Sequence, residues 1–231
     1  AFDQLRPVEL TKDYIKFAEG SVLIRCGDTV VLCNASVEEK TPPHVPEGHG
    51  WVTAEYSMLP RANRERSRRD IDKLKLSGRS AEIQRLIGRS LRSAVDREAL
   101  GERTITVDCD VLQGDGGTRT ASVTGGFVAL TLACRKLLAE GKVMRDPIIH
   151  QVAAVSAGII DEVPVLDLPY SEDSRAQVDL NCVMNEKGEL IELQGTGEGR
   201  SFTLSEQQEL VRLCAKGIRE LMEKQREILQ R

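Results

Sequence analysis

The stretch 115–121 reads DGGTRTA and opens a segment, RTASVTGGFVALTLACRKLL, whose apolar residues recur every three or four positions. This periodicity predicts a helix that begins near Thr118. The first turn of a helix leaves N–H groups unpaired at the positive end of the helix dipole, where anions bind. Gly116 and Gly117 let an anion approach the backbone closely. Thr118 can donate a hydroxyl hydrogen bond, and Arg119 can add a forked, charged contact. These residue types in this order are typical of a phosphate site.

A purely structural turn is the competing interpretation of the same stretch. Two glycines can make a tight connection between a strand and a helix, and Asp115 or Thr118 can cap the helix. The stretch matches neither GxGxxG nor GxxxxGK[ST], which disfavours a nucleoside triphosphate site. The local sequence leaves the phosphate site and the structural turn both open.

A pair of carboxylates in EDSRAQVDLN, residues 172–181, forms a second candidate site. We expect Asp179 in the middle of a strand, on the face opposite Val178 and Leu180, and Asp173 where the chain enters that strand. Carboxylates are poor strand residues unless they are used. Held together, the two could bind Mg²⁺, which commonly takes one or two carboxylates and completes its shell with water and substrate phosphate. The alternatives are an exposed strand face or an acid/base pair, although no histidine lies nearby in sequence to complete a nucleophilic triad.

The segment 61–79 is strongly basic within an acidic protein. It carries eight basic and three acidic residues, whereas the whole chain has a net charge of -4. Because it lacks an amphipathic period, we expect a mobile loop that suits the phosphate backbone of a large polyanion; a solvated charged surface is the alternative. The basic residues are Arg61, Arg64, Arg66, Arg68, Arg69, Lys73, Lys75 and Arg79.

The elements that must position these residues alternate between strands and helices. The predicted helix over 80–95 carries Arg85, Arg89 and Arg92 on the side away from its apolar face. A capping box marks the start of the last predicted helix, at Thr203 or Ser205. This order predicts a mixed α/β (α+β) domain with antiparallel pairing. The elements are a hairpin over 19–37 turning at Gly27 and Asp28, a helix over 80–95, a strand over 104–111, a helix from Thr118, a hairpin of 176–184 with 189–194, and a helix from Thr203 or Ser205 towards Leu229.

Length and composition limit the classes of protein that fit. With 231 residues and 40% hydrophobic content, the chain predicts a single domain, 1–231, around one core. Six cysteines without CxxC spacing indicate free thiols in a reducing compartment, so we expect a cytoplasmic protein. We find no apolar run near the roughly 20 residues that span a bilayer and expect no membrane contact. With 3% aromatic residues, a surface that stacks base after base is not expected.

Several longer motifs occur in order along nearly the whole chain and, together with the carboxylate pair, resemble the bacterial ribonuclease PH family. They are LRP at 5–7, EGSVL at 19–23, WVTAEYSMLPRA at 51–62, SGRSAEIQRLIGRSLR at 77–92, DGGTRTASVTG at 115–125 and ELQGTGE at 192–198. The resemblance implies a phosphorolytic 3′-to-5′ exoribonuclease that trims tRNA precursors and other RNA 3′ ends. It also implies a ribosomal protein S5 domain 2-like fold, mixed sheets packed with helices, a homohexamer built as a trimer of dimers, Mg²⁺, and inorganic phosphate as co-substrate.

The resemblance also implies a role for individual residues. Asp173 and Asp179 would be catalytic carboxylates that hold the metal, and Arg119 would be catalytic as well. Two alternatives stay open: a non-catalytic RNA-binding ring subunit of an exosome-like complex, and a hydrolytic metal-dependent nuclease. The first tends to lose the arginine or the carboxylates, which this chain retains, and the second needs more carboxylates. The implied phosphate-binding residues are Arg79, Gly117, Thr118 and Arg119, and the implied RNA-binding residues are Arg61, Arg64, Arg66, Arg68 and Arg69.

Overall fold

The computed structural model describes residues 2–69 and 77–230. Its strands are β1 (Val8–Lys12), β2 (Gly20–Cys26), β3 (Thr29–Glu38), β4 (Trp51–Met58), β5 (Thr104–Gln113), β6 (Val152–Ile160), β7 (Val163–Leu166), β8 (Val178–Asn185) and β9 (Leu190–Thr196). Its helices are α1 (Gly78–Arg92), α2 (Arg97–Leu100), α3 (Thr118–Ala139), α4 (Tyr170–Asp173) and α5 (Leu204–Gln230). The mixed α/β class is confirmed.

The first sheet has the strand order β1-β2-β3-β5-β4. The predicted hairpin over 19–37 is confirmed as β2 and β3, which turn at Gly27 with a φ of 56°. The expectation of antiparallel pairing is wrong for β4 and β5, which run parallel. Between them the chain passes through α1 and α2, and such a helical crossover returns a strand in the same direction.

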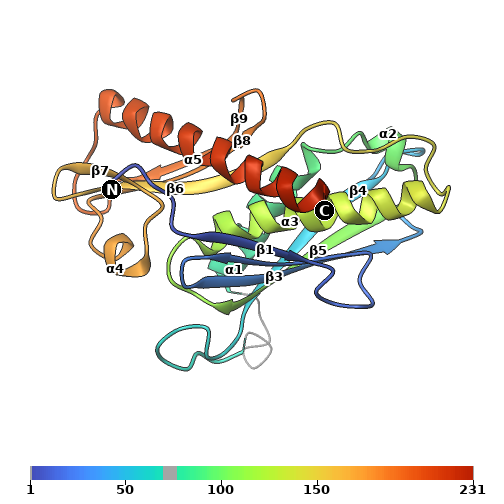
Figure 1. Ribbon diagram of the computed structural model, residues 1–231, viewed down its shortest axis with the longest axis horizontal. Helices are drawn as coiled ribbons and strands as arrows, with labels where there is room; N and C mark the ends of the chain where they lie inside the picture. Colours follow the sequence, from blue (N-terminus) through green and yellow to red (C-terminus); the bar gives the residue numbers. More distant parts are fainter. Residues whose placement is uncertain (1, 70–76, 231) are drawn as a thin grey trace.

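The second sheet is antiparallel, in the order β7-β6-β8-β9, and both of its faces are covered. The predicted hairpin with a turn near Gly188 is confirmed as β8 and β9. On β6, Val152 and Ala154 join the core that includes α3, whereas Ala153 and Val155 join the core under α5. The molecule therefore stacks the first sheet, the layer of α1 and α3, the second sheet, and α5 (Figure 1).

Helix α3 is the central element of the core, and its length and composition differ from what we expected of the apolar segments. Sixteen of its residues are buried because sheets lie on two sides of it. By length and composition it is the one helix of the described residues apolar enough to cross a membrane, so the statement that no apolar run reaches this length is wrong. Its most apolar window is 78% buried, as expected for the core helix of a layered fold.

The other predicted helices are confirmed with small shifts at their ends. α1 begins at Gly78, where the Ser77 hydroxyl accepts the N–H of Ser80 at 3.0 Å. α5 has the predicted capping box: Glu206 accepts the N–H of Thr203 at 2.7 Å, and Thr203 accepts the N–H of Glu206 at 3.2 Å. All six cysteines are free, as predicted, and all six are buried.

Candidate functional site

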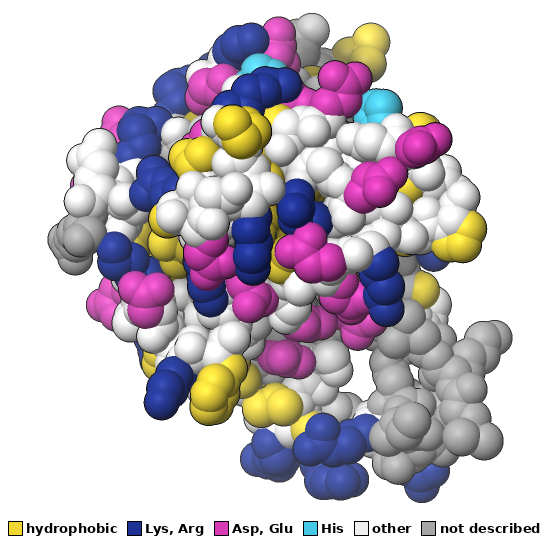
Figure 2. Space-filling model, turned by 90° about the vertical axis from the view of Figure 1, so that its right-hand side faces the viewer, with side chains coloured by type: hydrophobic (Ala, Val, Ile, Leu, Met, Phe, Trp, Pro, Cys, Tyr) yellow, Lys and Arg dark blue, Asp and Glu magenta, His cyan; other side chains and the backbone are white. Residues whose placement is uncertain are grey.

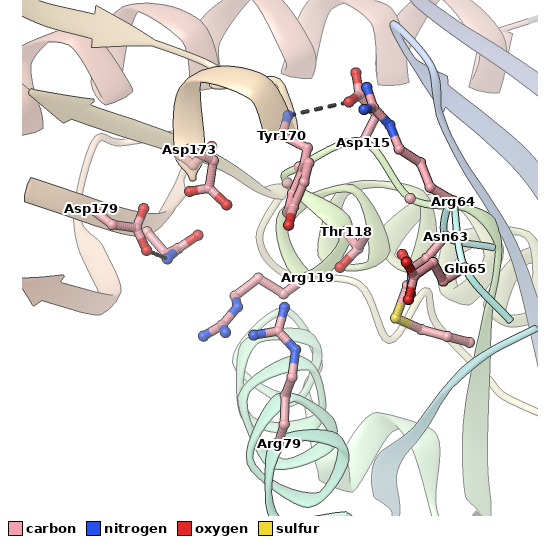
Figure 3. A pocket seen from close by; sticks show the side chains of 16 residues that line it. Asn63, Arg64, Glu65, Arg79, Asp115, Thr118, Arg119, Tyr170, Asp173 and Asp179 are labelled. Atoms are coloured by element: carbon pink, nitrogen blue, oxygen red, sulfur yellow. Dashed lines mark hydrogen bonds between the residues drawn. The ribbon is translucent and has the colours of Figure 1, made fainter. Parts of the chain in front are cut away.

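A cavity of about 660 Å³ opens where the start of α3 faces α4 and the start of β8 (Figure 3). An adjoining hollow of about 830 Å³ lies towards β9 and shares Arg79, Arg119, Asp173 and Asp179 with the cavity. The tertiary structure therefore brings the predicted phosphate residues and the predicted carboxylates together. The predicted residues that line the cavity are Arg64, Arg79, Gly117, Thr118, Arg119, Asp173 and Asp179.

The glycine loop before α3 requires its two glycines. Gly116 and Gly117 have left-handed φ angles of 74° and 65°. A Cβ on Gly116 would lie 2.3 Å from the carbonyl oxygen of Leu168, so only glycine allows this packing. The Thr29 hydroxyl donates to the Gly116 carbonyl at 2.6 Å and accepts the N–H of Asp115 at 2.9 Å. These bonds hold the loop from the side of the first sheet.

The capping interpretation of this loop is wrong for both residues considered. The N-cap of α3 is Gly117, which has no side chain, so neither Asp115 nor Thr118 occupies the capping position. The Thr118 hydroxyl instead shares a hydrogen bond of 2.8 Å with Tyr56, and an Asp115 carboxylate oxygen accepts the backbone N–H of Tyr170 at 3.3 Å. The start of α3 therefore lies at the cavity without a side-chain cap from the described residues, which is an arrangement that binds anions.

A buried ion pair that sequence reasoning missed fixes the loop to the second sheet. The Arg6 guanidinium lies 2.8 Å from an Asp167 carboxylate oxygen and donates to the carbonyl of Asp115 at 2.6 Å. The backbone N–H of Arg6 also donates to Asp167 at 2.8 Å. Arg6 belongs to the LRP motif, which indicated a resemblance but no role. Replacing either Arg6 or Asp167 with a neutral residue would leave the other charge buried without its partner and would disturb the glycine loop.

The two carboxylates come from different elements, which corrects their predicted local structure. Asp173 ends the short helix α4, which was not predicted, and Asp179 is the second residue of β8 rather than a mid-strand residue. The predicted face is confirmed, because Val178 and Leu180 pack in the core under α5 while Asp179 lines the cavity. Asn181, two residues further along the same face, donates from its amide to Asp179 at 3.2 Å. The period of two along a strand could have found Asn181.

The electrostatics of the carboxylates favour a cation between them. Burial and, after it, the like charge of the neighbouring Asp173 raise the pKa of Asp179 to about 6, against the lowering effect of Arg119 and the Asn181 hydrogen bond. Burial also raises the pKa of Asp173, against the lowering effect of Arg79 and Arg119. Among the described residues no cluster of three or more His, Cys, Asp or Glu could hold a metal. Two carboxylates with the Asn181 amide nearby fit Mg²⁺, which keeps most of its shell for water and phosphate.

Two arginines form the cationic wall opposite the carboxylates. Arg119 lies in the first turn of α3, and its Nη1 donates to Gln194 at 2.9 Å and to Glu82 at 3.3 Å. Arg79 lies in the first turn of α1 and is exposed. Both side chains extend into the cavity between Thr118 and the carboxylates (Figure 3). A doubly charged anion would therefore meet two guanidinium groups and a helix start.

Within the basic segment, residues 61–69 form a loop whose arginines are all exposed, and Arg79 belongs to α1. Figure 2 shows Lys and Arg side chains gathered at this lower end of the molecule. Arg64 lines the cavity, while Arg61, Arg66, Arg68 and Arg69 are not among its lining residues in the described part of the chain. The start of this loop is hydrogen-bonded to the cavity wall, because the carbonyl of Ala62 accepts the N–H of the cavity residue Gly114 at 2.8 Å. Lys73 and Lys75 lie outside the described residues.

Tyr170 and Ser156 are among the further cavity residues that sequence reasoning missed. Tyr170 lies in α4, remains 56% exposed, and points its ring into the cavity (Figure 3). Ser156 of β6 also lines the cavity, is 4% exposed, and its hydroxyl has no hydrogen-bond partner among the described residues. The sequence of β6 is a continuous apolar run in which one serine carries no signal.

Comparisons with known proteins agree with this geometry. Two family models match, "3' exoribonuclease family, domain 1" over residues 4–136 and "3' exoribonuclease family, domain 2" over residues 150–216. Ribonuclease PH of Bacillus pumilus (strain SAFR-032) is 55% identical over 229 residues, which are 98% of this chain and 95% of the relative.

Solved structures show the same fold at low identity. Rice (Oryza sativa) Rrp46 has a TM-score of 0.81 at 17% identity, covering 100% of this chain and 98% of the other. A chain of the Archaeoglobus fulgidus exosome with RNA bound to the active site has a TM-score of 0.83 at 23% identity, covering 97% and 90%. At these identities the likeness concerns the fold.

The two matched models, which together cover most of the chain, define the class of this protein as the 3′ exoribonuclease family. Within that class, the chain belongs to the ribonuclease PH family. It is a phosphorolytic 3′-to-5′ exoribonuclease, and inorganic phosphate is its co-substrate. The alternative of a silent ring subunit is not favoured, because the exosome neighbours are distant.

Proposed function

We propose that inorganic phosphate attacks the terminal phosphodiester of an RNA 3′ end in the cavity between the start of α3 and the Asp173–Asp179 pair. The observation that carries the proposal is the meeting of an uncapped helix start, two arginines and two carboxylates in one cavity. Arg79, Gly117, Thr118 and Arg119 would hold the attacking phosphate. Phosphate is a competent nucleophile near neutral pH, so the protein needs only to bring two anions together.

Asp173 and Asp179 would hold Mg²⁺, which supplies charge neutralisation at the scissile phosphate and the leaving 3′ oxygen. Asn181 orients Asp179 through its amide hydrogen bond, and Arg119 faces both carboxylates from the opposite wall. The products would be a nucleoside 5′-diphosphate and an RNA shortened by one residue. Because a phosphoanhydride-type product replaces a phosphodiester, the reaction would run backwards when phosphate is scarce.

The RNA would be the 3′ tail of tRNA precursors and other RNA 3′ ends, guided by the basic segment. Arg61, Arg64, Arg66, Arg68 and Arg69 are exposed, and Arg64 reaches the cavity wall. This placement supports a path in which the folded body of the RNA rests on the basic segment while its single-stranded tail enters the cavity.

We further propose a homohexamer, a trimer of dimers, in the cytoplasm, with 1–231 acting as one catalytic domain. The single-domain proposal is supported by the origin of the site, because Arg79 and Arg119 come from the first matched part and Asp173 and Asp179 from the second.

A hexameric ring would gather several basic segments around one entrance. Light scattering should report a mass near six chains of 25.5 kDa each, and an active monomer would contradict the assembly.

The test is a comparison of buffers with and without phosphate. With Mg²⁺ and a single-stranded RNA bearing a 3′ hydroxyl, phosphate-free buffer should release almost no product, and added phosphate should release nucleoside 5′-diphosphates. Arg79→Ala should raise the phosphate concentration needed for half-maximal rate, because a charge-assisted contact worth about 1.5–3 kcal/mol is lost. Nucleoside monophosphates formed in either buffer would instead indicate hydrolysis, and no product in both would indicate a silent subunit.

A further inference from the structure

Arg119 is held from two sides at a junction of three elements. Glu82 of α1 and Gln194 of β9 both accept hydrogen bonds from its Nη1, at 3.3 Å and 2.9 Å. The two acceptors are themselves joined, because the Gln194 amide donates to the same Glu82 oxygen at 2.9 Å. Each pair of the three side chains is therefore linked directly, and the guanidinium cannot rotate away without breaking two bonds.

These bonds occupy one terminal nitrogen of the guanidinium and leave its other N–H groups for a ligand. A guanidinium carries five N–H donors in a planar fork, and Nη1 alone contacts Glu82 and Gln194. The Arg119 side chain is 18% exposed and borders both hollows of the site. A long, flexible side chain loses much rotamer freedom when it binds an anion, unless the protein has already fixed it.

Gln194 also ties Arg119 to the strand that carries the carboxylate. In the second sheet Gln194 is the register partner of Asn181, and the Asn181 amide donates to Asp179 at 3.2 Å. A connection thus runs from Arg119 to the Gln194 side chain, through the backbone pairing of β9 with β8, and from the Asn181 side chain to Asp179. This connection sets the separation between the cationic wall and the anionic wall of the cavity.

We propose that Glu82 and Gln194 are positioning residues that hold Arg119 in the orientation in which it receives the attacking phosphate. Glu82 has a second effect, because its carboxylate competes with the phosphate for the charge of Arg119 and so weakens phosphate binding. The inference rests on the proposed role of Arg119. It concerns residues outside the phosphate-binding set, since neither acceptor is expected to touch the phosphate.

The same two elements provide a matched control. Arg89 lies two turns after Glu82 on α1, and Glu192 lies two residues before Gln194 on β9. They form an ion pair, with Arg89 Nη2 at 3.0 Å from both carboxylate oxygens of Glu192. Among the described residues, neither lines the cavity or the adjoining hollow. Glu192→Ala therefore removes a link between α1 and β9 without releasing Arg119.

The experiment measures the phosphate dependence of the rate, with Mg²⁺ and a short single-stranded RNA, for the full chain and its variants. Glu82→Ala and Gln194→Ala should each lower kcat/KM for phosphate by about tenfold or more, because a small misplacement of a positioned group costs much of the rate. Glu192→Ala should change it by less than about twofold. Glu82→Gln keeps an acceptor oxygen and removes the charge, so it should restore kcat and lower KM for phosphate below that of the parent chain.

The outcomes separate this inference from the proposed function. Equal unfolding midpoints for Glu82→Ala and Glu192→Ala would assign the rate loss to Arg119 rather than to stability. If Arg119→Ala is inactive while Glu82→Ala and Gln194→Ala behave like Glu192→Ala, the positioning role is wrong and the role of Arg119 stands. If Glu82→Gln is as impaired as Glu82→Ala, the positioning role of Glu82 is wrong. If Arg119→Ala keeps near-parental activity, both the proposed function of Arg119 and this inference fail.

Discussion

Two groups of crowded carboxylates lie on different faces of the molecule. Asp173 and Asp179 line the cavity beside the second sheet. Asp108 and Asp110 of β5 lie near Glu55 of β4, on the face of the first sheet away from its core residues. The pKa shifts in the two groups are similar. Burial is the largest cause of the rise in both, neighbouring carboxylates add to it, and the pKa values of Asp179 and Asp108 both lie at about 6.

The surroundings of the two groups differ. Arg79 and Arg119 oppose the rise in the pKa of Asp173, whereas Asp108 is influenced by burial and by the like charges of Glu55 and Asp110. The cavity also offers a helix start without a side-chain cap. A raised carboxylate pKa is therefore a weak indicator of a catalytic site on its own. Cations and backbone donors placed opposite the carboxylates distinguish the cavity from the outer face.

Replacing one carboxylate in each group should give the largest contrast. Asp179→Asn should lower phosphorolysis by a hundredfold or more, because one charged group aimed at the reacting phosphate is lost. Asp108→Asn should leave the rate within about twofold, because the outer face holds no phosphate-binding element among the described residues. The measurement is the release of nucleoside 5′-diphosphates from a short RNA. Comparable losses in both variants, with unchanged circular dichroism, would contradict the assignment of the site.

The second prediction concerns the arginines of the basic segment that do not line the cavity. Replacing Arg61, Arg66 and Arg69 with Ala should weaken binding of a tRNA precursor and flatten its salt dependence, because each lost phosphate contact lowers the slope of log K against log salt by about 0.7–0.9. Phosphorolysis of a short single strand should change much less, since these side chains are exposed and away from the described cavity wall. Equal losses on both substrates would mean that the segment shapes the cavity.

The smallest expected effect is a change in the stability of the folded chain caused by Asp108, on the face of the first sheet away from its core residues. The pKa of Asp108 is about 6 in the folded chain and near 3.9 when unfolded, so the folded state binds more protons between these values. Stability should therefore fall as pH rises from about 4 to about 6. Asp108→Asn removes this loss and should stabilise the chain at pH 7 by about 1 kcal/mol or less, since the side chain is only half-buried. Thermal unfolding at pH 4 and pH 7 checks it: a gain equal at both pH values would contradict the mechanism.

Local sequence was sufficient to predict several elements and to single out the residue types of the candidate site. The alternation in 104–111, the turn near Gly188 and the capping box at Thr203 each depend on residues close together in the chain. The same holds for DGGTRTA, because a glycine loop and the helix after it lie within a few residues of each other. Strand β6 carried no such signal, since burial on both faces removes the alternation that marks a strand.

The arrangement of the site depended on contacts between residues far apart in the chain. The local sequence made Asp115 a candidate helix cap, but in the folded chain α4 packs nearby and Asp115 accepts the backbone N–H of Tyr170 instead. Arg119 meets Glu82 and Gln194 only because α1 and β9 converge on the start of α3. Side-chain chemistry and short-range spacing are properties of the local sequence. The packing of two sheets around α3 supplies the opposing walls of charge, because it alone sets distances between segments separated by many residues.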